Sequence, residues 1–370
     1  MPESRNSMIF FLMLIAFVTT AICTVFFIKH AFRFGLVDIP NERSMHTNPI
    51  PRGAGICFVL VSLLVSFAAI ILDLNRLQEY YYVYIAISLV FAAGFLDDKK
   101  GVSPKVKFTF IITAALLLCI NGIYIDNLGH YIGYKLELPI YIAIPFTVFA
   151  ITGFTNALNL VDGLDGLAAM MSAVMMGAFL WIGYTNHDEL MIMLSSIFLA
   201  STVAFLLFNW HPAKVFMGDS GSLTLGFVVA VLAVRATEFI EPMAVLFIVV
   251  LPVLDTFIVM VRRKQRGLSL FSADKTHMHH ILYKRYEDIP YTVILLIYIQ
   301  IAFTIIGVQL RHADNFMSLI LFGILFFIML NLFDQRIKRR KPNKKRRKKL
   351  LKKIKKISER GEEQPLKPAG

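Results

Sequence analysis

Two adjacent aspartates, Asp97 and Asp98, end a long apolar run in the stretch FLDDKKGVSPK. A carboxylate at the centre of a bilayer costs at least about 2.5 kcal/mol, and the cost is lower near the headgroups. Because Lys99 and Lys100 follow directly, a solvated helix end with local ion pairs is one explanation of this stretch. The functional alternative is that the two carboxylates bind Mg²⁺ or accept a proton from a phosphate.

A second polar stretch, TNALNLVDGLDGLA, contains no basic residue. It brings Asn156, Asn159, Asp162 and Asp165 together beside two glycines. A helix N-cap needs only one such oxygen, and Asp-Gly pairs also occur in ordinary turns. The number of oxygen-bearing side chains therefore favours a functional site, although the spacing is not that of an EF-hand.

A third stretch, FNWHPAKVFMGDSGSLTLG, places Asp219 in a turn just ahead of an apolar run. Backbone amides at a helix start can bind a phosphate, while a cation bridges the phosphate to the carboxylate. No Gly-Lys-Ser/Thr follows the glycines, so this is not a Walker A loop. Asn209 offers amide hydrogen bonds and Phe216 an aromatic face for a flat base, with anchoring at the membrane interface as the alternative for Phe216.

Basic residues gather in the segment 262–290, which holds seven Lys and Arg residues together with His277, His279 and His280. No cysteine or further clustered ligand supports a zinc site there. On a helix His277 and His280 would share a face with Lys284, which predicts a cationic surface for a phosphate.

Two more charged residues complete the candidate set. Arg52 lies among Pro and Gly turns in DIPNERSMHTNPIPRGAG. Asp255 lies just inside an apolar run and is a functional candidate, with packing against a Ser or Thr as the alternative. Carboxylates, cations and an amide-rich turn are together what phosphoryl transfer needs, because the reaction requires charge neutralisation and alignment.

The elements that carry these residues are membrane helices. Hydrophobic residues make up 57% of the 370, charged residues 17%, and the mean hydropathy is +0.65, which excludes an ordinary soluble protein. Eleven apolar runs are long enough to cross a bilayer, and the first is interpreted as a membrane helix and not a signal peptide. The runs are approximately 8–28, 54–72, 80–96, 108–124, 138–154, 164–184, 190–208, 221–239, 243–261, 291–309 and 316–332. We predict an all-α polytopic membrane protein.

Basic residues set the expected orientation. Of 38 Lys and Arg residues, 33 fall in alternate connections and the C-terminal tail, which places the N-terminus outside and the tail in the cytoplasm. We predict a membrane catalytic domain over 1–333 and a basic cytoplasmic tail over 334–370. The predicted cytoplasmic active-site loops are 29–53, 97–107, 155–163, 209–220 and 262–290.

The tail carries 17 basic and 4 acidic residues, so it accounts for the whole net charge of +13. Leu350, Leu351, Ile354 and Ile357 share one helical face, which predicts a basic helix on anionic lipid headgroups. A disordered anchor is the alternative, and nucleic-acid binding is not favoured. A transporter, the alternative function of another class, would carry ionisable groups along its spans and an internal repeat, whereas the acidic residues here cluster at one membrane face.

Four stretches in order resemble the polyprenyl-phosphate N-acetylhexosamine-1-phosphate transferase family, in its WecA and TagO branch and related to MraY. They are GFLDDKKGVSPKVKF, NALNLVDGLDGLA, HPAKVFMGDSGSLTLGF and DKTHMHHIL, with a weaker match at DIPNERSMHTNPIPRG. The resemblance implies transfer of a sugar 1-phosphate, first of all GlcNAc-1-phosphate, from a UDP-N-acetylhexosamine to undecaprenyl phosphate. UMP would be released, and a lipid-linked glycan such as O-antigen or teichoic acid would begin at the bacterial plasma membrane.

The resemblance also implies roles for single residues, with Mg²⁺ as the cofactor and Mn²⁺ as its substitute. The implied roles are catalytic for Asp97, Asp98, Asp162 and His277, metal-binding for Asp219 and Asp98, and UDP-sugar-binding for Asn159, Asp165, Asn209, Phe216, His279, His280 and Arg52. The sequence Gly53-Ala54-Gly55 departs from the expected Gly-Gly pair and is similar to relatives that use a 6-deoxyhexosamine, the alternative sugar. The oligomeric state, with a homodimer as one option, stays open.

Overall fold

The computed structural model of the protein describes residues 2–40, 49–71, 77–265, 267 and 277–333. The predictions for the basic tail 334–370 therefore lie outside the described residues, as do parts of the first predicted loop and of the histidine-containing loop. The chain divides into one compact unit up to Phe326 and a second from Phe327, of which only the end of the last helix is described.

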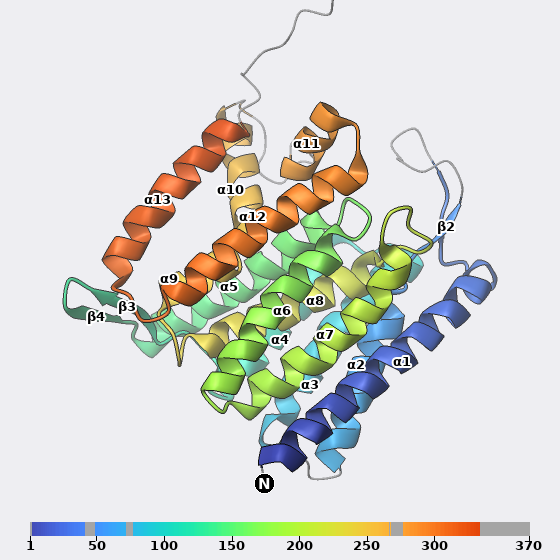
Figure 1. The fold of residues 1–370 in the computed structure, drawn as a ribbon, viewed down its shortest axis with the longest axis horizontal. Helices are drawn as coiled ribbons and strands as arrows, with labels where there is room; N and C mark the ends of the chain where they lie inside the picture. Colours follow the sequence, from blue (N-terminus) through green and yellow to red (C-terminus); the bar gives the residue numbers. More distant parts are fainter. Residues whose placement is uncertain (1, 41–48, 72–76, 266, 268–276, 334–370) are drawn as a thin grey trace, which may run out of the picture. The chain divides into compact units, whose positions relative to one another are not determined.

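Each predicted apolar run coincides largely with helical structure (Figure 1). The helices are α1 (Pro2–Phe34), α2 (Gly55–Ile71), α3 (Tyr81–Lys100), α4 (Pro104–Ile120), α5 (Ile140–Val161), α6 (Leu167–Thr185), α7 (Glu189–Asn209), α8 (Gly218–Ala236), α9 (Pro242–Ile248), α10 (Val250–Gln265), α11 (Met278–Tyr286), α12 (Ile289–Gln309) and α13 (Asn315–Leu332), with a 3₁₀ turn at Leu77–Tyr80. The prediction of an all-α polytopic membrane protein is confirmed.

Strands are few among the described residues. β1 (Val37–Asp38) pairs antiparallel with β2 (Ile50–Pro51), and β3 (Asn127–Tyr131) pairs antiparallel with β4 (Tyr134–Glu137). The first pair lies beside the candidate site, and the second forms a hairpin at the other end of the helices (Figure 1).

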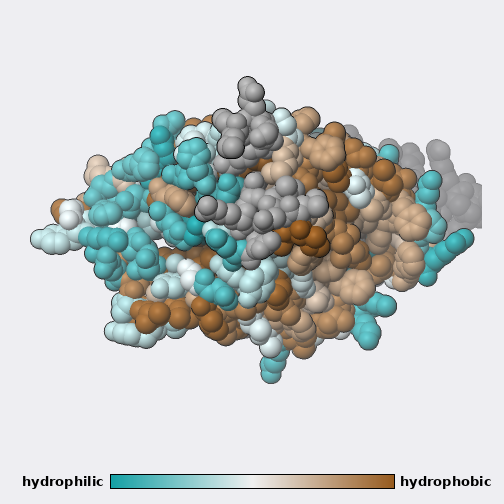
Figure 2. All heavy atoms as spheres, turned by 90° about the horizontal axis from the view of Figure 1, so that it is seen from below, coloured by the Kyte–Doolittle hydropathy of each residue, from teal (hydrophilic) through white to brown (hydrophobic). Residues whose placement is uncertain are grey.

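Eight of the described helices are long and apolar enough to cross a membrane, or nine if the bent pair α9 and α10 forms one span. α2 is a shorter apolar helix of 17 residues, and α4 also has 17. The count of eleven spans and their orientation stay predictions. In the view from below, hydrophobic residues form a broad zone bordered by hydrophilic residues (Figure 2), the surface that a bilayer-embedded protein presents.

The ninth predicted span, 243–261, is not one straight helix, because α9 and α10 are bent by 82°. Pro252 in the first turn of α10 has no N–H to donate to the carbonyl four residues earlier, that of Ile248. Gln300 Nε2 from α12 donates to that carbonyl instead, at 2.7 Å. The proline thus explains why the helix breaks here, and the glutamine explains how the freed carbonyl is satisfied.

α8 is the central helix of the fold. It packs against α2, α3, α5 and α6. Of its 18-residue apolar stretch 83% is buried, compared with 22% for the corresponding stretch of α1. A helix that is apolar on all sides is stable only when it is surrounded by other elements. The helices packed around α8 therefore fix the position of Asp219 in its first turn.

Gly94 allows α3 to approach the start of α8. A Cβ at Gly94 would lie 2.4 Å from the Asp219 carbonyl oxygen, which is closer than real atoms come. The side chains of Asp97 and Asp98 follow on the next turn of the same helix. Because Gly94 has no side chain, the acidic end of α3 can lie directly beside the acidic start of α8.

We expect Gly94→Ala to lower the free energy of unfolding by about 1–3 kcal/mol, the usual cost of overpacking, and to reduce ligand binding by displacing Asp219. The matched control is Gly177→Ala in α6, where a Cβ would meet open space. Replacing that helical glycine should stabilise the protein by about 0.5–1 kcal/mol. Thermal unfolding in detergent measures both effects, and equal melting temperatures for the two variants would contradict this account.

Candidate active site

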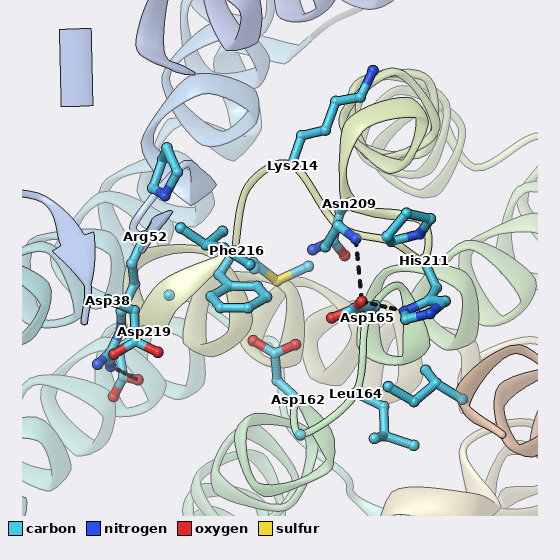
Figure 3. Close-up of a pocket in the computed structure, with 18 of the residues that line it drawn as sticks. Asp38, Arg52, Asp162, Leu164, Asp165, Asn209, His211, Lys214, Phe216 and Asp219 are labelled. Atoms are coloured by element: carbon cyan, nitrogen blue, oxygen red, sulfur yellow. Dashed lines mark hydrogen bonds and ion pairs between the residues drawn. The ribbon is translucent and has the colours of Figure 1, made fainter. Parts of the chain in front are cut away.

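The polar stretches meet at one end of the helices because consecutive helices are joined by short connections and therefore run antiparallel. This end holds the C-terminal turns of α3, α5 and α7 and the first turns of α4, α6 and α8. A cavity of about 840 Å³ opens there (Figure 3). Predicted site residues that line it are Arg52, Asn159, Asp162, Asp165, Asn209, Phe216, Asp219 and His280.

Two predicted loop segments are partly helical. Asn159 lies in the last turn of α5, because the apolar residues of this stretch continue the helix as far as Val161. Asp97 and Asp98 lie in the last turn of α3. The side chains are therefore held on rigid elements, which position a site better than loops do.

Asp98 forms a side-chain cap for α8. Its two carboxylate oxygens accept the backbone N–H groups of Asp219 at 2.8 Å and Ser220 at 2.9 Å, and its side chain is fully buried. These amides have no partner within their own helix and carry the positive end of the helix dipole. Gly218, with φ +73°, leaves no room for a Cβ, which would lie 2.6 Å from both Asp98 oxygens. Asp98 thus holds the backbone of Asp219.

Lys107 joins the carboxylates of Asp97 and Asp219. Its Nζ lies 2.8 Å from Asp219 Oδ2 and 3.3 Å from Asp97 Oδ2. Asp97 Oδ1 accepts the backbone N–H of Val102 at 2.9 Å, which fixes the turn between α3 and α4. Lys107 thus neutralises part of the negative charge at this end of the helices.

Arg52 comes from a distant part of the sequence. Its guanidinium lies 3.8 Å from Asp98 Oδ1 and 3.7 Å from Asp219 Oδ1. The backbone beside it is joined to the segment before α8, since Phe216 N–H donates to the Pro51 carbonyl at 2.8 Å and Gly53 N–H donates to the Phe216 carbonyl at 3.2 Å. This pairing carries the first predicted loop into the site.

Asp162 faces the cavity beside Phe216 (Figure 3). In the described part of the chain its carboxylate has no hydrogen bond or ion pair. Burial and the negative charge of Asp219 raise its pKa to about 7, against the lowering effect of Arg52. A carboxyl group that titrates near neutral pH, close to other carboxylates, is a candidate for proton exchange or for binding a cation.

Asn209 has a structural role that the sequence does not indicate. Its Oδ1 accepts Gly166 N–H at 3.1 Å, its Nδ2 donates to the Val215 carbonyl at 2.9 Å, and it is 3% exposed. Both groups of the amide therefore hold backbone segments around the cavity. This use of the amide favours an indirect contribution to ligand binding over the direct hydrogen bonds that were predicted.

Asp165 is paired with His211 in the same wall. Asp165 Oδ2 lies 2.7 Å from His211 Nδ1 and accepts the N–H of Ala213 at 3.2 Å (Figure 3). The bond orients the imidazole, whose side chain is 34% exposed. Asn159 Nδ2 donates to Ser222 Oγ at 2.7 Å, so its Oδ1 is the group left for a ligand in the cavity.

The three histidines adopt different environments. His277 and His279 are buried, and their ring centroids are 5.7 Å apart, whereas His280 lines the cavity. Burial lowers the pKa of His279 to about 3, so its ring is neutral. The predicted cationic face of His277, His280 and Lys284 is wrong for His277, because this side chain is 5% exposed and bonds Asp255. The partner of Asp255 is thus a histidine and not a Ser or Thr.

Sequence reasoning missed Lys107 and His211. Lys107 belongs to the KVK segment at the start of α4, and its charge was counted only as an orientation signal. His211 lies two residues after Asn209 in the stretch that had been singled out. In the sequence, Lys107 and His211 could have been recognised as site candidates because each lies close to an acidic stretch.

The donor set suits a hard cation that substrate oxygens complete. In the described ranges no group of three or more His, Cys, Asp or Glu residues is arranged to hold a metal. Asp162 and Asp219 nevertheless both line the cavity. Mg²⁺ is commonly held by one or two carboxylates together with substrate phosphates and water, so these residues fit that ion.

The helices and this cavity, lined by carboxylates and by the basic side chains of Arg52 and Lys214, define an integral membrane protein with an enzyme-like site. The glycosyl transferase family 4 profile matches residues 80–237. The chain is 30% identical over 334 residues, 89% of its length and 92% of the relative's, to the probable undecaprenyl-phosphate N-acetylglucosaminyl 1-phosphate transferase of Bacillus subtilis.

Two undecaprenyl-phosphate alpha-N-acetylglucosaminyl 1-phosphate transferases are also similar. The Yersinia pestis protein is 33% identical, over 69% of this chain and 71% of the relative's length. The Escherichia coli K12 protein is 29% identical, over 88% of this chain and 93% of the relative's length. The chain belongs to this transferase family. The resemblance predicted from the four motifs is confirmed.

The pKa of Asp162 predicts how stability depends on pH. The folded protein keeps a proton that the unfolded chain releases above its ordinary value of 3.8, so stability falls as pH rises from about 4 to about 7. Asp162→Asn removes this loss. Without divalent cations its melting temperature should rise relative to wild type between about pH 5 and about pH 7 and then level off. The gain is at most about 4 kcal/mol, and less because the carboxylate is only half-buried.

The control is Asp126→Asn, beyond the other end of α4, which should show no such pH-dependent difference from wild type. A difference between Asp162→Asn and wild type that stays constant over this range would contradict the assignment of the raised pKa to Asp162.

Proposed function

We propose that this protein transfers N-acetylhexosamine 1-phosphate, most directly GlcNAc-1-phosphate, from a UDP-sugar to undecaprenyl phosphate and releases UMP. The observation that carries the proposal is the cavity in which Asp162 and Asp219 lie beside Arg52 and Phe216, at one end of the membrane helices. The names of the relatives support the same reaction. A transporter, the alternative of another class, has no support from this family.

The cavity offers separate groups for the parts of a UDP-sugar. The face of Phe216 suits a stacked nucleobase, and the pair of Asp165 and His211 supplies hydrogen-bonding groups in the same wall. Arg52 and Lys107 lie around Asp219 and would neutralise the phosphate oxygens. The nucleotide-sugar would therefore span the cavity from Phe216 to Asp219.

The acceptor phosphate would meet the donor at the ends of α3 and α8. Asp162 lies in the same cavity as Asp219 and would face the acceptor phosphate there. Asp97 fixes the turn between α3 and α4 and pairs with Lys107, and Asp98 fixes Asp219. This division of roles assigns orientation to Asp98 and contact with the reacting groups to Asp162 and Asp219.

We propose Mg²⁺ as the cofactor, with Mn²⁺ as its substitute. Asp219 and Asp162 would hold it, because both oxygens of Asp98 already accept amide hydrogens. When bound, the ion would supply charge neutralisation for the diphosphate and the leaving UMP. Lys107 and Arg52 both contact the oxygens of Asp219 and would share them with the ion.

We also propose where the protein acts and how its tail contributes. We place the site on the cytoplasmic side of a bacterial plasma membrane, crossed eleven times, because 33 of the 38 basic residues fall on that side. A UDP-linked 6-deoxyhexosamine is the alternative sugar. We also propose that the tail 334–370 binds anionic headgroups, and a homodimer remains one option for the assembly.

The decisive measurement is UMP release by purified protein with undecaprenyl phosphate, Mg²⁺ and a panel of UDP-sugars. We expect turnover with a UDP-N-acetylhexosamine, loss on chelation, and recovery with Mg²⁺. Asp219→Asn should reduce turnover by about a hundredfold or more, since it removes a charge from the reacting groups. Asp314→Asn, a carboxylate at the start of α13, should retain turnover. Absence of UMP with every sugar would overturn the proposal.

Truncation after Asp334 tests the tail. The shortened protein should keep wild-type turnover, because the cavity residues all precede this position. It should retain less phosphatidylglycerol during purification, and the difference should shrink as salt rises, since headgroup attraction is screened. Unchanged lipid retention would contradict the predicted role of the tail.

A further inference from the structure

A second buried acidic centre lies outside the cavity lining, at the start of α11. Asp255 in α10 is 3% exposed, and its carboxylate lies between two groups of the histidine segment. Oδ2 lies 2.7 Å from His277 Nδ1, and Oδ1 accepts the backbone N–H of Met278 at 2.6 Å. Both side chains of the Asp255–His277 pair are almost fully excluded from solvent.

One of these bonds caps a helix. Met278 is the first residue of α11, and His277 at its N-cap makes no capping bond with its own side chain. Asp255, 23 residues before Met278 and on a different helix, supplies the missing acceptor. Because an N-terminal helix amide otherwise lacks a partner, this bond fixes where α11 begins relative to α10.

The other bond orients an imidazole. A carboxylate can only accept a hydrogen bond, so Nδ1 of His277 carries the hydrogen that points to Asp255. Nε2 is then the ring nitrogen left for any other contact. An asparagine in place of Asp255 has one acceptor and one donor, so it could keep the bond to Met278 only by donating to Nδ1 and reversing the tautomer.

The histidines connect this pair to the cavity. His279 is 2% exposed and packs against the turn that carries Asp162, since a Cβ at Gly163 would lie 2.4 Å from His279 Nε2. The His279 and His280 ring centroids are 4.2 Å apart, and His280 lines the cavity. A shift of α11 would therefore move the support of Asp162 and one wall of the site together.

We propose that Asp255 is a positioning residue of this active site, which docks α11 and fixes His277 so that His279 supports the Asp162 turn and His280 faces the cavity. Asp255 does not line the cavity itself, so its action passes through the histidines. The inference rests on the proposed transfer reaction only for its kinetic measurement.

Two substitutions separate a positional role from a purely structural one. Asp255→Asn keeps the volume and one acceptor for Met278, whereas Asp255→Ala removes both bonds. We expect Asp255→Asn to lower kcat by about tenfold to a hundredfold, because small displacements of groups that line an active site cost this much, while the melting temperature changes little. Asp255→Ala should also increase hydrogen exchange in the peptide 277–286.

A double-mutant cycle with His277→Ala tests the route. If Asp255 acts through His277, Asp255→Asn should cost little further activity in the His277→Ala background. The matched control is Asp188→Asn, because Asp188 is also buried, caps α7 through Met191 N–H and pairs with the basic side chain of Arg235. This control should keep kcat per folded molecule, since Asp188 lies at the other end of the helices.

The outcomes are distinct. Wild-type kcat and KM in Asp255→Asn, or fully additive effects in the cycle, would overturn the positional role. Failure of the proposed transfer would appear as no UMP release by the wild-type protein. In that event, comparison of hydrogen exchange in α11 between wild type and Asp255→Ala still tests the docking, and equal exchange would overturn it.

Discussion

The bond between the Asp98 carboxylate and the first amides of α8 is the constraint on which the site depends. It joins the end of α3 to the start of α8, the most buried of the described helices that are long enough to span a membrane, with two hydrogen bonds of 2.8 and 2.9 Å. Glycines at positions 94 and 218 give the space that this approach requires. A buried carboxylate is stable here because the amides have no other partner and the helix dipole favours negative charge. Asp219 is placed as a consequence.

The basic side chains near the junction of Asp98 and α8 neutralise only some of the carboxylates there. Lys107 and Arg52 both reach Asp219, yet Asp162 lies in the same cavity with no paired cation among the residues described. Burial, together with the negative charges of Asp219 and the other carboxylates, therefore raises the pKa of Asp162. A site with such a charge pattern can take up a cation and phosphates together, the requirement of phosphoryl transfer from a nucleotide-sugar.

The bent pair α9 and α10 contributes to the site through Asp255. Pro252 breaks the span, Gln300 satisfies the carbonyl that is left, and the redirected α10 carries Asp255 to the histidine segment. A polar side chain inside a membrane span is costly unless it is paired. Asp255 meets this condition by binding groups that belong to the site, so the same bonds that stabilise the helix also orient the histidines.

The sequence by itself determined the membrane class, the helical runs, the family and the stretches that carry the site, because hydropathy and motif order are properties of local sequence. Only the tertiary structure decided that Asp98 caps a helix, that the Asn209 amide is occupied by backbone, and that His277 is buried against Asp255. Asp98 and Ser220 are 122 residues apart in the sequence, and Asp255 and His277 are 22 residues apart. Spacing along a chain fixes which face of one helix a residue occupies, whereas distances between helices depend on packing, here on glycines and a proline break.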